Sequence, residues 1–272
     1  MLTLAKTLGQ HHELIVALTR KNVTLRYKQS YLGFAWAILR PLMLMLVFAL
    51  VRSLVGIDSG DIPYALLSFS ALTLWLFFQD ASIEGVGSVV SHANLIRKIY
   101  FPREVFPLTS IASKLVELAI TLVLLFLLMA WFNVTPGLQA LWVPILILYT
   151  SLAALAIAFL GAAANVYARD VSSAMPILFN LLMYASPIIY PLELVKRKLL
   201  IEHGAGEWSS TLYVAYLMNP MAGAVDAFQK ALLLNRPPDF SALEPGAILI
   251  AVALPVSYLV FKKAESYFAD VI

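Results

Sequence analysis

The feature that most constrains this chain is a stretch from Leu118 to Ala168 without a single charged residue. A helix needs about 20 apolar residues to cross a hydrocarbon core of about 30 Å. The stretch is too long for one crossing, and its cluster Asn133 to Gly137 (NVTPG) is typical of a turn. The sequence therefore predicts two membrane-spanning helices joined by a short connection.

The composition agrees with a membrane protein. Of the 272 residues, 61% are hydrophobic and 13% are charged, whereas roughly a quarter are charged in an ordinary soluble domain. The absence of cysteine excludes disulfides and thiolate metal sites. The net charge of +3 is small and the basic clusters lie beside apolar stretches, so the sequence does not indicate nucleic-acid binding.

Other apolar stretches complete a predicted all-α integral membrane fold of about six transmembrane helices. Ile62 to Gln79 and Val171 to Leu192 are free of charge and are expected to be the second and fifth spans. The third is expected to begin near Phe106. It then includes Lys114 and Glu117, which lie three apart on one helical face and can pair.

The first and last predicted spans are less regular. The last, Pro245 to Phe261, is short and contains Pro255, which a membrane helix tolerates when neighbours satisfy the freed carbonyl. The first, near Leu32 to Ile57, carries Arg40 and Arg52. Their side chains are expected to reach opposite interfaces.

Lysine and arginine are distributed asymmetrically among the predicted loops. The short loops near residues 58–61 and 133–137 have none, so the positive-inside bias places both termini in the cytoplasm. The first apolar run starts some thirty residues in and is long enough to span, so no cleavable signal peptide is expected. The basic residues on the predicted inner side are Lys6, Arg20, Lys21, Arg26, Lys28, Arg97, Lys98, Arg103, Arg169, Lys262 and Lys263.

Residues 1–30 are expected to form a cytoplasmic segment with a basic amphipathic helix at Leu14 to Tyr27. Such a helix lies in the plane of the membrane interface. A solvated basic arm that only sets the topology is the alternative. The interface residues would be Arg20, Lys21, Arg26, Tyr27 and Lys28.

Residues 91–104 (SHANLIRKIYFPRE) form a predicted cytoplasmic loop. Apolar side chains recur at helical spacing on one side, basic side chains lie on the other, and Pro102 ends the predicted helix. Such a helix can be a lever that a partner pushes or can rest on lipid headgroups, and periodicity alone favours neither. The apolar side is Leu95, Ile96, Ile99 and Tyr100, and the basic side is Arg97 and Lys98.

Residues 193–244 form a long, partly apolar segment on the predicted outer side. Asn219 followed by Pro220 is typical of an N-cap and a first helical position. Helices that dip back into the membrane would explain the apolar content, and an ordinary extracytoplasmic helical hairpin is the alternative. The expected apolar stripe is Met221, Val225, Phe228 and Leu232.

No motif for catalysis or nucleotide binding occurs in the sequence. GxxxxGK[ST], HExxH and GxSxG are all absent, and the four histidines are expected to be solvated. Asp80 and Glu84 are expected to be charges at the inner end of the second span. The last three spans lack the carboxylates or histidines of an ion-coupled transporter, so energy for transport must come from elsewhere.

Aromatic residues are frequent, and most single ones are expected in interfacial belts. Together they suit sugar rings, whose C–H surfaces stack on aromatic faces. The candidates for lining a substrate path are Tyr31, Phe34, Trp36, Tyr184 and Tyr190.

Three stretches resemble a known family. Arg26 to Trp36 (RYKQSYLGFAW), followed by Arg40-Pro41, resembles the amphipathic start and first span of permease subunits of type-2 ABC exporters. The narrower resemblance is to exporters of O-antigen, capsule or teichoic-acid polymers. Asn94 to Glu104 resembles the coupling region of that family, and Arg169 to Val171 resembles its fourth-to-fifth loop. The similarity covers essentially the whole chain in order.

The resemblance implies a single permease domain over residues 1–272, two copies of which assemble with two ATP-binding subunits in the bacterial cytoplasmic (inner) membrane. ATP and Mg would bind to those partners, with no cofactor in this chain. The substrate would be a lipid-linked polysaccharide, and residues 193–244 would be re-entrant gate helices. Coupling to the ATPase would fall to Asn94, Leu95, Ile96, Arg97, Lys98, Ile99, Tyr100, Phe101 and Arg103.

Other functions remain open at this stage. The same architecture can export a drug or a lipid, in which case the channel residues would be aliphatic. A membrane enzyme for polyprenyl-phosphate sugars would need clustered catalytic charges, which the loops lack, and a scaffold would leave the apolar outer segment unexplained. In the leading hypothesis, ATP-driven closure pushes Leu95 to Phe101, tilts the second and third spans and opens a seam between the first and fifth spans of two copies.

Overall fold

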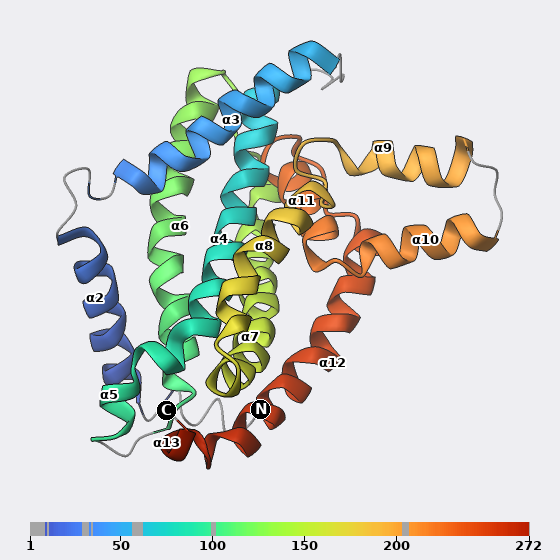
Figure 1. Ribbon diagram of the computed structural model, residues 1–272. Helices are drawn as coiled ribbons and strands as arrows, with labels where there is room; N and C mark the ends of the chain where they lie inside the picture. The colour runs from blue at the N-terminus through green and yellow to red at the C-terminus, as the bar shows by residue number, and fades with distance from the viewer. Residues whose placement is uncertain are drawn as a thin grey trace.

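The computed structural model describes residues 9, 11–28, 33, 35–55, 62–98, 102–202 and 207–271. Every regular element within these ranges is a helix (Figure 1). The elements are α2 (His12–Lys28), α3 (Ala35–Val55), α4 (Tyr64–Ser91), α5 (Ala93–Ile96), α6 (Val105–Trp131), η1 (Leu138–Trp142), α7 (Val143–Tyr167), α8 (Asp170–Tyr184), α9 (Leu192–Arg197), η2 (Lys198–Glu202), α10 (Glu207–Leu217), α11 (Pro220–Leu232), α12 (Phe240–Glu265) and α13 (Phe268–Val271).

Four helices are long and apolar enough to cross a membrane, namely α4, α6, η1 with α7, and α12. The other two predicted spans correspond to α3 and to α8, which has 15 residues. The all-helical membrane fold is therefore confirmed, while the count of six spans stays a prediction. The turn between α6 and α7 is also confirmed, because α6 ends at Trp131 and Asn133 has a φ of 57°.

Helix α4 lies in the middle of the bundle, where it contacts α3, α6, α7, α8 and α11 (Figure 1). Small residues bring α4 and α7 close together, as in many membrane helix pairs. A Cβ atom added at Gly85 would lie 2.4 Å from the Cβ of Ala158, and one added at Gly161 would lie 2.4 Å from Val86 Cγ2. The two backbones could not approach so closely with larger side chains at these positions.

Two boundaries differ from the sequence-based expectation. Asp80 and Glu84 do not end a helix, because α4 continues to Ser91. The fifth predicted span ends early, since α8 stops at Tyr184 and not at Leu192. Pro187 explains the early end: proline lacks an N–H group, and it disfavours the helical conformation of the residue before it.

The segment after α8 contains four short helices, and α9 and α10 extend sideways from the bundle (Figure 1). The predicted start of α11 is confirmed: Asn219 caps it, accepting a hydrogen bond from the Met221 amide at 3.1 Å. All four residues of the predicted apolar stripe are buried. Gln229 Nε2 donates to the Leu67 carbonyl at 2.9 Å, which fixes α11 to α4. Insertion of these helices into the membrane stays a prediction.

Candidate functional site

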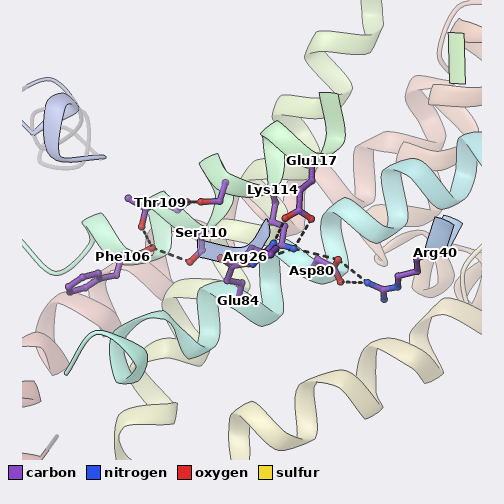
Figure 2. Close-up of polar contacts among 10 residues, drawn as sticks. Arg26, Arg40, Asp80, Glu84, Phe106, Thr109, Ser110, Lys114 and Glu117 are labelled. Carbon is purple, nitrogen blue, oxygen red and sulfur yellow. Dashed lines mark hydrogen bonds and ion pairs between the residues drawn. The ribbon is translucent and has the colours of Figure 1, made fainter. Parts of the chain in front are cut away.

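Six charged side chains from four helices meet beside α4 (Figure 2). We call this group the inner charge cluster. It contains three cations and three carboxylates, so their formal charges cancel. Its carboxylates on α4 lie seven and eleven residues before Ser91, or roughly 10–17 Å from the end of that helix. The members are Arg26 (α2), Arg40 (α3), Asp80 and Glu84 (α4), and Lys114 and Glu117 (α6).

Arg26 bridges two helices. Its guanidinium donates through Nη2 to Glu84 Oε2 of α4 and through Nη1 to Glu117 Oε1 of α6. Burial alone would lower the pKa of Arg26, but the charges and hydrogen bonds of the two glutamates outweigh it and raise the pKa above the ordinary value. Arg26 is therefore charged at every physiological pH and holds the end of α2 against the α4–α6 hairpin.

Lys114 is the most buried cation of the cluster, with its side chain 8% exposed. Its Nζ lies 2.9 Å from Glu117 Oε2, and 3.7 Å from a carboxylate oxygen of both Asp80 and Glu84. The predicted pairing of Lys114 with Glu117 is confirmed. An ammonium group in contact with three carboxylates offsets the desolvation that would otherwise disfavour charges inside an apolar bundle.

Arg40 connects α3 to the cluster. Its Nη1 donates to both carboxylate oxygens of Asp80 at 2.9 Å. The Arg40 side chain is 45% exposed beside this carboxylate, and the expectation that it reaches toward a membrane interface stays a prediction. The side chain of Arg52, its predicted counterpart at the opposite interface, lies outside the described residues.

A cavity of ≈ 220 Å³ adjoins the inner charge cluster between α3, α4 and α6. Its wall combines the cations and carboxylates with apolar side chains, among them Trp36, Phe77 and Leu118. Trp36, one of the predicted substrate-path residues, is about half exposed at this cavity. The cavity thus presents an aromatic face next to three cations and two carboxylates of the cluster.

The other predicted substrate-path residues lie elsewhere or outside the described chain. Tyr184 is exposed at the end of α8, and the Tyr190 hydroxyl donates to the Tyr184 carbonyl at 3.2 Å. The structure therefore brings these two tyrosines together. Tyr31 and Phe34 fall outside the described residues.

The predicted coupling loop closes the hairpin formed by α4 and α6 (Figure 1). In its described part, residues 91–98 and 102–104, the regular element between α4 and α6 is α5, which is shorter than the predicted helix and is followed by a turn at Arg97 and Lys98. Ile96 is buried while Arg97 and Lys98 are exposed, so the loop has an apolar and a basic side as predicted. Asn94 is exposed and Leu95 is half-buried. Ile99, Tyr100 and Phe101 lie outside the described residues.

Arg103 and Glu104, at the end of this loop, contact the last turn of α12. The Arg103 amide donates to Glu265 Oε1 at 2.9 Å, and Glu104 Oε2 lies 2.5 Å from Lys262 Nζ. Sequence reasoning had assigned Arg103 to the surface that meets the ATPase. The structure places its backbone and guanidinium against α12, and its role in coupling stays a prediction.

The basic residues of α2 divide into two groups. Arg20, Lys21 and Lys28 are exposed, as expected of a basic surface. Arg26 is also exposed, but its guanidinium in addition joins the inner charge cluster, and its place in the membrane interface stays a prediction. For Tyr27 only the backbone is described. Since Leu18 is buried against the bundle, α2 packs with one side on the protein, and its place in the membrane interface stays a prediction.

Sequence reasoning missed the inner charge cluster as a unit. Its signal was present: opposite charges inside apolar helices usually pair with one another, and the cluster draws equal numbers of each sign from four such segments. A second missed contact is neutral. Gln79 Nε2 donates to Asn180 Oδ1 at 3.4 Å and thereby links α4 to α8.

Among the described residues, no group of three histidine, aspartate or glutamate side chains is arranged to hold a metal ion.

Comparison with known proteins assigns this architecture to a family. The chain is 27% identical to the O-antigen export system permease protein RfbA of Myxococcus xanthus over 99% of both chains. It is 24% identical to a protein of the same name from Klebsiella pneumoniae over 97% of both. Over 41% of both chains it is 25% identical to the capsule polysaccharide export inner-membrane protein CtrC of Neisseria meningitidis serogroup B. Residues 13–233 match the ABC-2 type transporter family, and the chain therefore belongs to that family of membrane proteins.

Proposed function

We propose that this chain is the membrane-spanning subunit of an ATP-driven exporter that moves a lipid-linked polysaccharide from the cytoplasm to the outer side of the membrane. The observation that carries the proposal is the match over nearly the full length to permeases named for O-antigen export. The match to a capsule export protein supports a polysaccharide as the substrate class. In this assignment the chain is a transport subunit and not an enzyme.

The partners follow from the same assignment. Two copies of this chain assemble with two ATP-binding subunits, which hold ATP and Mg at the cytoplasmic side. The exposed basic residues of α2 and of the loop between α4 and α6 support this orientation, because basic residues favour the cytoplasmic side. Both termini then lie in the cytoplasm, and residues 193–244 lie at the outer exit.

The inner charge cluster supports a mechanism in which the loop moves several helices together. A push on residues 92–104 tilts the α4–α6 hairpin, because the loop closes it. Arg26 and Arg40 then transmit the tilt to α2 and α3 through their carboxylate partners. The pair of Gln79 and Asn180 transmits it to α8.

The exposed faces of α3 and α8 support a passage between two copies. Leu46 and Leu50 on α3 and Ile177 and Leu181 on α8 are all more than half exposed. Faces of this kind cover one another in an oligomer or contact lipid. We place the polysaccharide in the seam between α3 of one copy and α8 of the other, with Trp36 and Tyr184 as stacking residues.

The proposal is tested in a strain that lacks this gene and accumulates its polysaccharide inside the cell. The wild-type gene is expected to restore polysaccharide at the surface, as detected by antibody labelling of intact cells. Replacing Arg97 and Tyr100 together by alanine should abolish export while the protein stays in the membrane. Lys263→Met, which changes an exposed lysine outside the loop, serves as the control.

Two outcomes would contradict the proposal. Restored export in the Arg97 and Tyr100 double variant would remove the loop from the mechanism. Labelling of a cysteine introduced at Lys263 from the outer side of intact cells would reverse the orientation, and the natural absence of cysteine makes this labelling free of background.

A further inference from the structure

The loop between α4 and α6 is held by α12 as well as by the two helices that it joins. Its last residues, Arg103 and Glu104, meet the last turn of α12, which contains Lys262 and Glu265. We call these four residues the α12 joint. Because α12 follows α6 by more than a hundred residues in sequence, the joint fixes a distant helix to the loop.

Glu104 is the buried centre of the joint, with 1% of its surface exposed. Its carboxylate binds Lys262 Nζ at 2.5 Å and accepts a hydrogen bond from the Tyr258 hydroxyl at 3.5 Å. A carboxylate buried to this extent is stabilised only by such partners. Glu104 also immediately precedes Val105, the first residue of α6, where the helix dipole favours a negative charge.

Arg103 completes the joint from the opposite side. Its backbone amide donates to Glu265 Oε1 at 2.9 Å, and its Nη1 donates to the Glu265 carbonyl at 2.6 Å. That carbonyl belongs to the last residue of α12, where the helix dipole favours a cation. Lys262 Nζ also binds Glu265 Oε2 at 2.7 Å. The start of α6 and the end of α12 therefore meet with complementary dipoles and complementary side chains.

Aromatic packing makes the α12 side of the joint rigid. The ring of Phe261 lies 5.2 Å from that of Phe159 on α7 and 5.4 Å from that of Phe268 on α13. All three rings are fully buried. The end of α12 is therefore packed against α7 and α13 as well as against the loop.

The middle of α12 is less tightly packed than its inner end. A cavity of ≈ 250 Å³ lies between α7 and α12, next to Pro255. Proline removes one backbone hydrogen bond from the helix and allows it to bend there. The inner end of α12 is attached to the loop and the middle has space beside it. The helix can therefore bend at its middle when the loop moves the inner end.

We propose that the α12 joint stays closed through the transport cycle, so that a push on the loop moves α12 together with α6. Arg103, Glu104, Lys262 and Glu265 are positioning residues in this inference. The inference rests on the proposed function, in which an ATP-binding partner pushes the loop. Helix α12, the last predicted span, is then moved directly from the cytoplasmic side.

The test opens and closes the joint in the purified complex with its ATP-binding partner, reconstituted in vesicles. Lys262→Met opens it by removing the cation of Glu104, and Glu265→Gln is a milder second variant should the first fold poorly. We expect ATP hydrolysis to continue in either variant while the polysaccharide exported per ATP falls by about fivefold to tenfold. Lys263→Met, the exposed neighbour of Lys262, should leave this ratio unchanged.

A cross-link separates coupling from mere folding. Arg103 and Glu265 are both replaced by cysteine in the naturally cysteine-free chain, and a short thiol-reactive cross-linker joins them. The double variant should be uncoupled before the reaction and should regain export after it, because the covalent link replaces the joint. Modification of each single cysteine by a monofunctional reagent of similar size should not restore export.

The outcomes are distinct. An unchanged export ratio in both Lys262→Met and Glu265→Gln would overturn the inference. Export by the double variant that stays low after the cross-link forms would also overturn it, since a joint held closed would then not support transport. Failure of the proposed function has a different signature, because the unmodified complex itself would then fail to export polysaccharide.

Discussion

The two ends of this bundle, which we expect to face the cytoplasm and the outside and call the inner and outer halves, are held together by different interactions. In the inner half, ion pairs connect α2 and α3 to α4 and α6, and the start of α6 to α12. In the outer half, α11 is held largely by apolar packing, with Met221, Val225 and Phe228 fully buried, and by one hydrogen bond from Gln229 to the Leu67 carbonyl of α4. Ion pairs can adjust their geometry by side-chain rotation, whereas a packed apolar core resists gradual deformation.

The difference indicates where the molecule can change shape. Ion pairs that can adjust lie near the loop that we expect a partner to push, next to the aromatic packing of Phe159, Phe261 and Phe268, whereas apolar packing dominates around α11, the helix that we expect at the exit. Four substitutions test this contrast, two in each half, and their expected effects decrease from the first to the last.

Phe228→Ala should have the largest effect. The side chain is fully buried in the outer half, and removal of a buried phenylalanine costs about 3–5 kcal/mol because a cavity remains. Thermal unfolding of the purified protein should occur at a clearly lower temperature. Phe126→Ala, on an exposed face of α6, is the control and should change the melting temperature little.

Lys114→Met should have the next largest effect, in the inner half. It leaves Asp80, Glu84 and Glu117 with only two cations, and an uncompensated buried charge costs about 3 kcal/mol. The free energy of unfolding should recover partly when Glu117→Gln is added, because the charges balance again. If the double variant were no more stable than Lys114→Met, charge balance would not be what holds the inner half together.

Gly223→Ala should be intermediate, in the outer half. An added Cβ atom would lie 2.3 Å from the Ala242 carbonyl oxygen, so α11 and α12 would have to separate. Such overpacking costs about 2 kcal/mol. Gly87→Ala is the matched control, because its added Cβ meets nothing within 4 Å. Equal melting temperatures of the two variants would show that the outer half adjusts as easily as the inner.

Arg40→Gln should have the smallest effect on stability. Its side chain is 45% exposed, and exposed ion pairs contribute about 1 kcal/mol or less. Because the pair is partly solvated, its contribution should shrink further in high salt. The unfolding temperature of the wild type and of Arg40→Gln should therefore converge as salt is added. A loss as large as that of Lys114→Met would mean that solvent does not screen this part of the cluster.

Much of the fold was predictable because charge-free stretches and turn residues mark membrane helices directly. Asn133 to Gly137 gave the turn between α6 and α7, and Asn219 with Pro220 gave the start of α11. The full length of α4 was missed, since a search for charge-free stretches stops at Asp80. Only the three-dimensional structure reveals the cations that neutralise Asp80 and Glu84.

The candidate site was predictable only where its contacts lie within one helix. Pairs within one helix, such as Lys114 with Glu117, follow from spacing alone. Pairs between helices, such as Arg26 with Glu84 or Glu104 with Lys262, depend on which helix faces rotate toward one another. A single sequence does not contain that rotation, so the partners of Arg26 and Arg103 could not be predicted.

The inner charge cluster also constrains how the chain is made. Arg40 leaves the ribosome before Asp80, its carboxylate partner, so this ion pair can form only after α4 has been made. Arg26 has to wait longer, because one of its two partners, Glu117, lies on α6. The polar contacts that join α2, α3, α4 and α6 are therefore completed only after α6 has been synthesised.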